Sequence, residues 1–305
     1  MRQVIPIASL ILSFVVFPVK PQQTPEEGPI IQANVDVVNV LCTVRDRKGN
    51  YVQNLRREDF EISEDGKRQV IDFFHSETGK DAQPLTVVLL VDTSGSVKDK
   101  LRFEQEAASN FLNQTLRKDK DMAAVVQFDS DINLVQDFTY DYSTLESAIF
   151  DMKAGGATKL YDAIWAAVED LLRNEIGRKV MVILSDGADT QSMISEKEAI
   201  RSAQDEDVII YGIGIQSGRY DSDFGTLKNF SRATGGLFFN SKANPRKLRE
   251  AFMKINREIK NQYSLGYVAL NTQQDGSFRE VKVRVKKRRM KTTHRKGYFA
   301  PERTS

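Results

Sequence analysis

Hydrophobic positions along the chain repeat with two different periods, and the change of period divides the sequence into three parts. In residues 30–80, short runs of alternating apolar and polar residues are separated by turn sequences, as in antiparallel strands. In residues 85–262, continuous apolar runs alternate with stretches that carry apolar residues on one helical face. The period of two returns in residues 263–301. The pattern therefore predicts β structure on both sides of an α/β unit.

The middle part predicts strands that are buried on both faces, because its apolar runs are continuous and rich in β-branched residues. These runs are residues 85–91, 125–128, 180–184 and 208–213. Amphipathic helices are predicted between and after them, within residues 101–116, 160–172 and 248–259. Such alternation is typical of a doubly wound, mostly parallel sheet with helices on both sides.

The two flanking β segments, residues 30–82 and 263–305, are each too small to bury a core alone. We therefore expect them to pair into one smaller β-sandwich, with an α/β domain of residues 83–262 inserted between them. The lone cysteine, Cys42, falls in a strand-like run and is expected to be a small buried hydrophobic residue.

The N-terminal residues predict export. Arg2 precedes a mostly apolar stretch, residues 4–19, so residues 1–20 have the features of a signal peptide. The stretch is short for a helix that crosses ~30 Å of hydrocarbon. Since no A-x-A-like cleavage site follows, an N-terminal anchor remains an alternative. Residues 21–29 are expected to be a linker, and the protein to be periplasmic, secreted or tethered to the cell envelope.

Composition excludes several kinds of site. Lys plus Arg number 44 against 42 for Asp plus Glu, so the whole-chain charge does not indicate nucleic-acid binding. One cysteine rules out a disulfide framework and a Cys-built zinc site. The two histidines, His75 and His294, have no catalytic pattern around them. We therefore expect a protein that is not an enzyme.

Positive charge is concentrated locally in residues 282–296, which contain nine lysines and arginines. The simplest interpretation is the solvated face of an edge strand, where lysines also oppose aggregation. An alternative is contact with anionic lipid or polysaccharide of the cell envelope. Nucleic acid is not expected there, because the chain is predicted to be exported and this segment has few aromatic residues.

The candidate chemistry follows the first central strand, in Asp92-Thr93-Ser94-Gly95-Ser96. A carboxylate and two hydroxyls at alternate positions offer three oxygens to one point. Thr158 and Asp186 come from two further loops that are expected at the same sheet edge, where ligands of such sheets bind. Hard cations such as Mg²⁺ prefer oxygen ligands and retain water. These five residues would leave an open position on the metal for a carboxylate from outside.

Asp92-x-Ser94-x-Ser96, with Thr158 and Asp186, is similar in order, spacing and context to the metal-ion-dependent adhesion site of von Willebrand factor type A domains. The resemblance covers residues 85–262. It implies that the hydroxyls hold one Mg²⁺, or Mn²⁺ or Ca²⁺, directly or through water. It also implies that a Glu or Asp of a protein partner completes the coordination.

The whole chain also resembles a group of secreted bacterial proteins related to these domains. The similar phrases are Leu55-x-x-Glu58-Asp59-Phe60 with Glu64-Asp65-Gly66, and Gly297-Tyr298-Phe299-Ala300-Pro301 near the end. This resemblance supports the architecture more than a function.

Three further polar residues are candidates for groups beside the metal. Asp99 follows Ser96 but is followed by Lys100, so an acidic pair for a second metal is broken; a place in the first helical turn is the other interpretation. Asp189 and Thr190 follow Asp186 and could support the metal ligands or start a helix.

The sequence leaves three classes of function to compare. A metal-dependent binding or adhesion module is favoured. The alternatives are an envelope scaffold with a structural metal and a hydrolase that uses the metal as a Lewis acid. The hydrolase lacks a His, Cys or Lys constellation near the metal, and a phosphate loop is absent because Gly155-Gly156-Ala157-Thr158-Lys159 has the wrong order.

Overall fold

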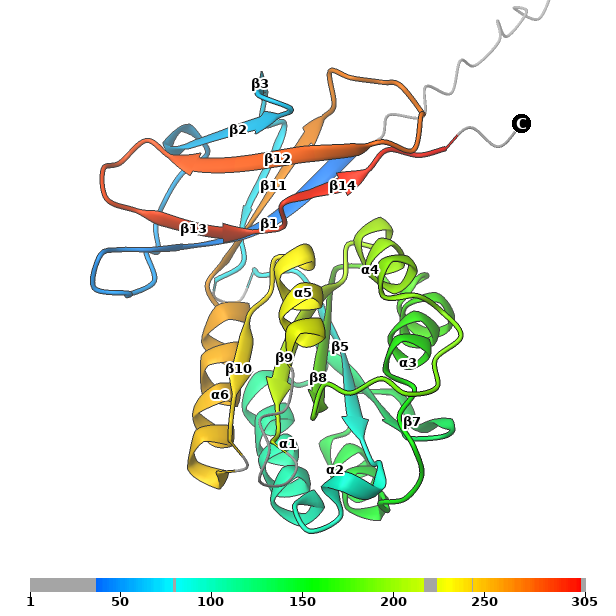
Figure 1. The fold of residues 1–305 in the computed structure, drawn as a ribbon. Coiled ribbons are helices and arrows are strands. Elements are labelled where there is room, and N and C mark those ends of the chain that lie inside the picture. The colour runs from blue at the N-terminus through cyan, green and yellow to red at the C-terminus, as the bar shows by residue number, and fades with distance from the viewer. Residues whose placement is uncertain (1–36, 79–80, 217–223, 243, 303–305) are drawn as a thin grey trace, which may run out of the picture. The chain divides into compact units, whose positions relative to one another are not determined.

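A computed structural model describes residues 37–78, 81–216, 224–242 and 244–302. The signal or anchor segment predicted for residues 1–20 and the linker predicted for 21–29 lie outside these residues. No helix within the described ranges is long and apolar enough to cross a membrane. Three sheets are present in the described chain, one of six strands and two of four (Figure 1).

The six-stranded sheet has the order β10-β9-β8-β5-β6-β7. All neighbouring strands pair in parallel except β7, which is antiparallel to β6 at one edge. Every residue of the central strand β5 is buried. The prediction of a mostly parallel, doubly wound sheet is therefore confirmed. Its strands are β5 (Leu85–Asp92), β6 (Met122–Phe128), β7 (Ile132–Thr139), β8 (Arg178–Ser185), β9 (Ile209–Gly214) and β10 (Phe238–Asn240).

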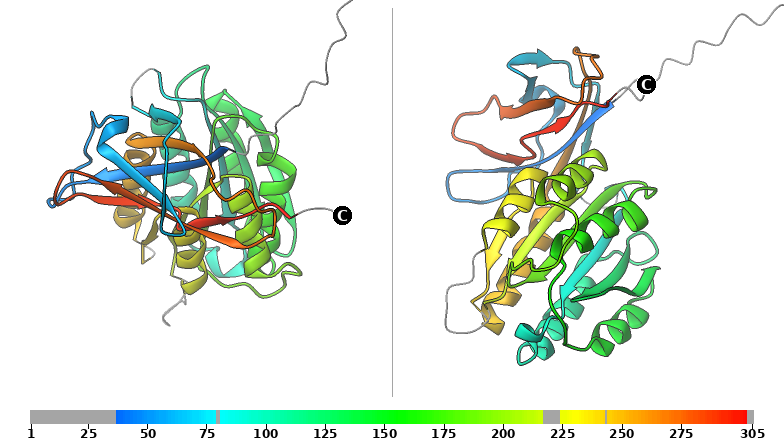
Figure 2. Two further views of the ribbon diagram at one scale, coloured as in Figure 1. Left: turned by 90° about the horizontal axis from the view of Figure 1, so that it is seen from above. Right: turned by 45° about the vertical axis from the view of Figure 1, so that its right-hand side comes forward.

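Helices lie on both faces of this sheet (Figures 1 and 2). One face packs against α1 (Leu101–Thr115), α2 (Tyr142–Asp151) and α6 (Pro245–Ile259). The other packs against α3 (Leu160–Ala166) with its π-helical continuation (Ala167–Leu172), α4 (Glu196–Asp205) and α5 (Gly225–Thr234). The three predicted helices are α1, α3 and α6.

Five elements of the α/β part were not predicted from the hydrophobic pattern, namely α2, α4, α5, β7 and β10. The helix α4 shows why, because the only apolar residues that it buries are two small ones, Ala199 and Ala203. It is instead marked at its start by a capping box, in which the Ser195 side chain accepts the Glu198 N–H and Glu198 accepts the Ser195 N–H. In β7 no residue is buried, so alternation is weak there.

Both four-stranded sheets combine strands from the two ends of the sequence, so blue and red strands lie side by side in Figure 2. One has the order β13-β1-β11-β4 and the other β14-β12-β2-β3. Their strands are β1 (Val37–Arg45), β2 (Phe60–Glu64), β3 (Lys67–Gln69), β4 (Phe73–Ser76), β11 (Gln262–Val268), β12 (Phe278–Val285), β13 (Lys291–His294) and β14 (Gly297–Phe299), with a 3-10 turn at Arg57–Asp59.

The two sheets share one hydrophobic core, as the predicted sandwich requires. Val40 pairs with Leu265 across β1 and β11, while Ile62 pairs with Val283 across β2 and β12. Cys42 of β1 is buried in the same core, and burial raises the pKa of its thiol, as expected for an unreactive packing residue.

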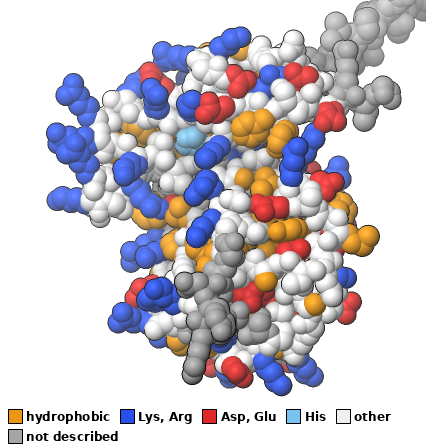
Figure 3. All heavy atoms as spheres, viewed as in Figure 1, with side chains coloured by type: hydrophobic (Ala, Val, Ile, Leu, Met, Phe, Trp, Pro, Cys, Tyr) orange, Lys and Arg blue, Asp and Glu red, His pale blue; other side chains and the backbone are white. Residues whose placement is uncertain are grey.

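The basic segment, residues 282–296, differs from its simplest interpretation. It is not one edge strand, because β12 is an inner strand of its sheet and only β13 lies at an edge. Arg295 is buried and donates to the Asp207 carboxylate at 2.6 Å and the Asn39 carbonyl at 2.7 Å. Most other cations of the segment are exposed, and Figure 3 shows lysine and arginine side chains on this part of the sandwich.

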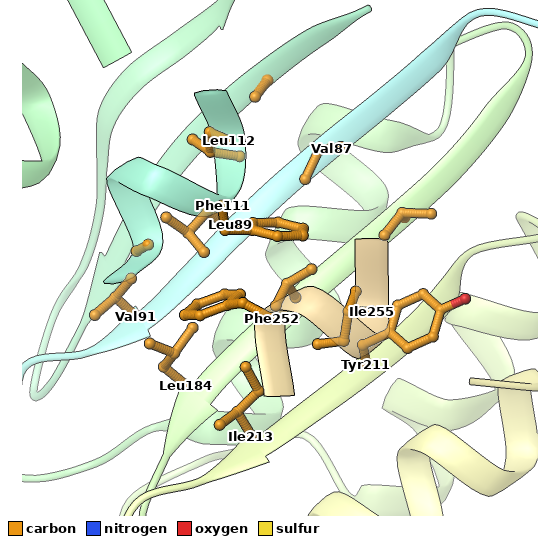
Figure 4. Packing of buried hydrophobic residues seen from close by; sticks show 14 of the residues in the cluster. Val87, Leu89, Val91, Phe111, Leu112, Leu184, Tyr211, Ile213, Phe252 and Ile255 are labelled. Carbon is orange, nitrogen blue, oxygen red and sulfur yellow. The ribbon is translucent and has the colours of Figure 1, made fainter. Parts of the chain in front are cut away.

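The core between the sheet and helices α1 and α6 positions the carboxyl ends of the central strands. Val87, Leu89 and Val91 of β5 point toward these helices (Figure 4). Phe111 of α1 stacks on Phe252 of α6 with 4.8 Å between ring centroids. Such packing fixes the loop between β5 and α1, because neither end of the loop can move without opening the core.

We expect residues 83–262 to fold alone and residues 28–82 alone to remain unfolded. In the sandwich, β1 is hydrogen-bonded to β11 and β13, and β2 to β12, so the N-terminal segment alone loses strand partners and half of its core. Amide dispersion in two-dimensional NMR spectra measures this. A well-dispersed spectrum from residues 28–82 would refute the shared sandwich.

Candidate metal centre

Asp92 ends the central strand and is completely buried. Its Oδ1 accepts the Ser94 N–H at 2.9 Å, and its Oδ2 accepts the Ser185 hydroxyl at 2.7 Å. Burial raises the pKa of Asp92 to about 6. The hydrogen bonds from Ser94 and Ser185 lower this pKa but do not cancel the effect of burial, and the negative charge of Asp186 raises it further. The carboxylate is therefore held in one orientation at a site that disfavours its negative charge.

The two serines of the motif lie where β5 gives way to a short 3-10 turn, Gly95–Val97. Ser94 precedes this turn, is 3% exposed, and accepts the Val97 N–H on its carbonyl at 3.1 Å. Ser96 is within the turn, and its side chain lies outside the described part of the structure. The turn changes the direction of the chain directly after Asp92 and Ser94.

The loop that carries Thr158 is hydrogen-bonded directly to the loop after β5. The Gly155 N–H donates to the Thr93 carbonyl at 2.6 Å, and the Gly95 N–H donates to the Gly156 carbonyl at 3.1 Å. Thr158 itself is 5% exposed. Two segments more than fifty residues apart in sequence are thereby joined beside the end of β5.

Gly156 is the residue type that this junction requires. Its φ is +81°, and a Cβ atom there would lie 2.7 Å from the Ser130 Oγ and 3.0 Å from the Ser130 nitrogen. A side chain would therefore be strained and would also collide with the loop after β6. Ser130 supports the same segment by accepting the Ala157 N–H at 2.8 Å.

Asp186 follows β8, the strand next to β5, and is 7% exposed. Its Oδ1 accepts the Ala188 N–H at 3.1 Å. The adjacent Ser185 hydroxyl donates to Asp92 and accepts the Gly187 N–H at 3.0 Å. The loops after β5 and β8 are thus joined through one serine, and Asp92 lies close enough to Asp186 for their charges to interact.

Asp189 and Thr190 hold the loop after β8 against the start of α3. Asp189 accepts the Leu160 N–H at 2.8 Å and the Ser192 hydroxyl at 2.6 Å, which caps the helix. The Thr190 N–H and hydroxyl donate to the Thr158 carbonyl at 3.0 and 3.2 Å. Thr190 therefore anchors the backbone of Thr158, and Asp189 has the helix-start role that was the alternative.

Asp99 has a different position from the one expected. It is exposed and lies in a turn before α1, which begins at Leu101, rather than in the first turn of the helix. The helix starts later because the 3-10 turn Gly95–Val97 is followed by three further turn residues. The residue after Asp99 is Lys100, so there is no pair of adjacent acidic residues here for a second metal.

Glu104 is the residue of this region that the sequence interpretation missed. It lies in α1, is 1% exposed, and interacts electrostatically with Asp92 and Asp186. Its position could have been noticed, because it follows Leu101 by three residues and precedes Ala108 by four, so an acid occupies the apolar face of the helix.

The donor set at this edge fits a hard divalent cation. The three joined loops carry two aspartates and three hydroxyl residues, and oxygen ligands of this kind suit Mg²⁺ or Mn²⁺. No group of three or more His, Cys, Asp or Glu side chains that could hold a metal ion occurs in the described ranges. A site here consequently depends on the hydroxyls of Ser94, Ser96 and Thr158 as well as on the two aspartates.

The sequence profile of the von Willebrand factor type A (VWA) domain matches residues 86–254, from the central strand into the last helix. The chain belongs to the VWA domain family. The VWA domain of this chain therefore includes the whole six-stranded sheet and its helices, and the sandwich lies outside the matched residues. VWA domains commonly mediate protein–protein interactions.

An uncharacterized protein of Borreliella burgdorferi is 27% identical in an alignment of 183 residues, and the match covers 50% of this chain and 53% of that protein. The chain thus spans about half the length of that relative. A VWA protein from Catenulispora acidiphila has a TM-score of 0.53 at 13% identity and covers 88% of this chain and 74% of its own.

A third related structure is proximal thread matrix protein 1 from the mussel byssus, described with a zinc-occupied MIDAS motif. It has a TM-score of 0.51 at 18% identity, over 62% of this chain and 48% of that chain. At these identities the two structures show a shared fold.

We expect the stability of the metal-free protein to fall as pH rises from about 4.5 to 8, through Glu104. Burial, with the charges of Asp92 and Asp186, raises the pKa of Glu104 from 4.5 to about 8, although Lys100 opposes this. The folded chain then holds a proton that the unfolded chain releases, and the slope is at most about 1.4 kcal/mol per pH unit.

Urea unfolding in EDTA at several pH values measures this slope. Glu104→Gln should remove this contribution, while Glu106→Gln, at an exposed position of the same helix, should keep the wild-type profile. Parallel profiles for wild type and Glu104→Gln would contradict the expectation.

Proposed function

We propose that the VWA domain binds one divalent cation per chain, Mg²⁺, Mn²⁺ or Ca²⁺, and uses it to capture an acidic side chain of a protein partner. The cation would be held by Asp92, Ser94, Ser96, Thr158 and Asp186. The observation that carries the proposal is the junction of three hydrogen-bonded loops, which buries Asp92 beside Asp186 at the carboxyl edge of the sheet.

The chemistry of the site favours binding over catalysis. A bound cation would supply a positive centre with a coordination position for a carboxylate from outside. The chain's own residues fix this geometry: Ser185 and the Ser94 N–H orient Asp92, and Thr190 anchors the backbone of Thr158. The partner is therefore expected to present Glu or Asp.

The two histidines support a role other than catalysis. His75 is in β4 and His294 in β13, both strands of the sandwich rather than the VWA sheet. The His294 Nε2 accepts the Val283 N–H at 3.2 Å and its Nδ1 lies 2.6 Å from the Arg295 carbonyl, so both ring nitrogens have structural partners. A hydrolase with this metal would need a base from another residue type. An envelope scaffold with a structural metal remains the second candidate.

The location of the protein remains a prediction from the sequence. We propose that residues 1–20 direct export and that the VWA domain acts in the periplasm, outside the cell or tethered to the envelope. The exposed cations of residues 282–296 would then face envelope components, and contact with anionic lipid or polysaccharide would be an additional surface interaction.

Calorimetry tests the metal site. The wild-type protein should bind one Mg²⁺ or Mn²⁺ per chain, and Asp92→Asn should weaken binding by about tenfold or more, because a neutral amide replaces a carboxylate. Asp99→Asn, at an exposed position of the following turn, should bind like wild type. Urea unfolding in EDTA verifies that both variants fold. Equal affinity for wild type and Asp92→Asn would refute the site.

Metal-dependent capture tests the function. A partner isolated from envelope extract should bind in Mg²⁺, dissociate in EDTA and rebind when Mg²⁺ or Mn²⁺ is restored. Thr158→Ala should weaken capture more than folding, because it removes one metal oxygen and little packing, while Thr272→Ala, at an exposed position of the sandwich, should weaken neither. In surface plasmon resonance, the same affinity with EDTA as with Mg²⁺ would favour the scaffold instead.

A further inference from the structure

Glu104 is a buried acidic residue without a hydrogen-bond partner. It lies near the start of α1, on the buried face of the helix that includes Ala108 of the core against the sheet. Its side chain is 1% exposed, and neither carboxylate oxygen has a hydrogen-bond partner in the described part of the chain. A buried carboxyl in this state costs free energy that its surroundings must offset.

The other three buried glutamates of the described chain show how the protein ordinarily offsets this cost. Glu64 accepts hydroxyls from Tyr267 and Tyr298, each at 2.8 Å. Glu77 pairs with Arg178 at 3.4 Å, and Glu258 pairs with Arg45 and accepts the Thr43 hydroxyl. Each has a hydrogen-bond or ion-pair partner, so Glu104 departs from a consistent pattern.

The nearest charges do not supply the missing partner. Lys100, one turn earlier, lowers the pKa of Glu104, yet its ammonium donates to the Gln216 carbonyl. Asp92 and Asp186 have the opposite effect, because both are acidic and close enough to raise that pKa. Three acidic side chains thus share one poorly solvated region, and their mutual repulsion is relieved by a cation.

We propose that Glu104 is a third acidic positioning residue of the metal centre, which strengthens the binding of a divalent cation by its charge and through bridging water. The inference rests on the proposed function of the site. Direct ligation together with both aspartates is not proposed, because the described residues contain no group of three acidic side chains that could hold a metal. The centre then combines three carboxylates with hydroxyl ligands, which favours divalent over monovalent cations.

The test compares Mn²⁺ affinity of the full chain by electron paramagnetic resonance with the affinities of two matched variants. Glu104→Gln should bind Mn²⁺ about tenfold more weakly or worse, because it removes a charge beside the metal and keeps the shape. Glu106→Gln, two residues along α1 and exposed, should bind like wild type. Glu104→Asp retains the charge and should recover part of the affinity.

A second measurement separates this role from a structural one. Saturating Mg²⁺ should raise the Tm of wild type and Glu106→Gln more than that of Glu104→Gln, even where Glu104→Gln is as stable as wild type in EDTA. If Glu104→Gln does not fold, Glu104→Met makes the same comparison.

The outcomes separate the two proposals. Equal Mn²⁺ affinity and equal Mg²⁺-induced Tm shifts in wild type and the neutral variant would overturn the role of Glu104 and leave the metal site intact. Failure of the wild-type protein to bind Mn²⁺ would instead overturn the metal site itself, and this inference with it.

Discussion

The carboxylate of Asp92 is held at the end of a strand that is buried on both faces, and the groups that hold it also join the loops around it. Ser185 donates to it from the neighbouring strand, and the backbone of Thr93 and Gly95 bonds to the loop that carries Thr158. A charged group at such a depth is unfavourable unless its environment offsets the loss of water. The arrangement of all three loops is therefore coupled to the state of one carboxyl group.

This coupling explains why acidic residues in the protein fall into two kinds. Away from the site, buried Glu64, Glu77 and Glu258 are matched by tyrosines or arginines, so their contribution is to the fold. Burial raises the pKa of Glu258 as well, but Arg45 opposes this. At the sheet edge, burial raises the pKa of Asp92 to about 6 and that of Glu104 to about 8, and Glu104 has no hydrogen-bond partner in the described part of the chain. Buried carboxylates of this kind lower the stability of the metal-free fold, and a bound cation would stabilise them most. A metal-binding site can therefore form at a place where the metal-free protein is less stable.

The sandwich outside the VWA domain adds a second constraint. Its sheets contain strands from both ends of the sequence, so the chain enters and leaves the VWA domain beside the same core. Buried Arg295, after β13, bonds to Asp207 next to α4, and Arg45 of β1 pairs with Glu258 of α6. These ion pairs connect the sandwich to helices on each face of the sheet. The protein is a VWA domain with its own β extension, and the metal loops lie at strand ends of the VWA sheet.

The sequence by itself determined the parallel sheet and helices α1, α3 and α6, because these depend on apolar periodicity that can be read locally. It also indicated that the end segments pair, because each is too small to bury a core alone. The five candidate ligands were also named from the sequence, because four of them follow predicted strands and Thr158 precedes a predicted helix. The sequence did not reveal α4 or β7, whose few buried apolar residues leave little periodicity. Only the tertiary structure decided that Asp99 precedes α1, that Arg295 is buried, and that Glu104 lies beside two aspartates. Those outcomes depend on burial and on distances between residues far apart in the chain, and a residue's type does not reveal which neighbours folding will place around its charge.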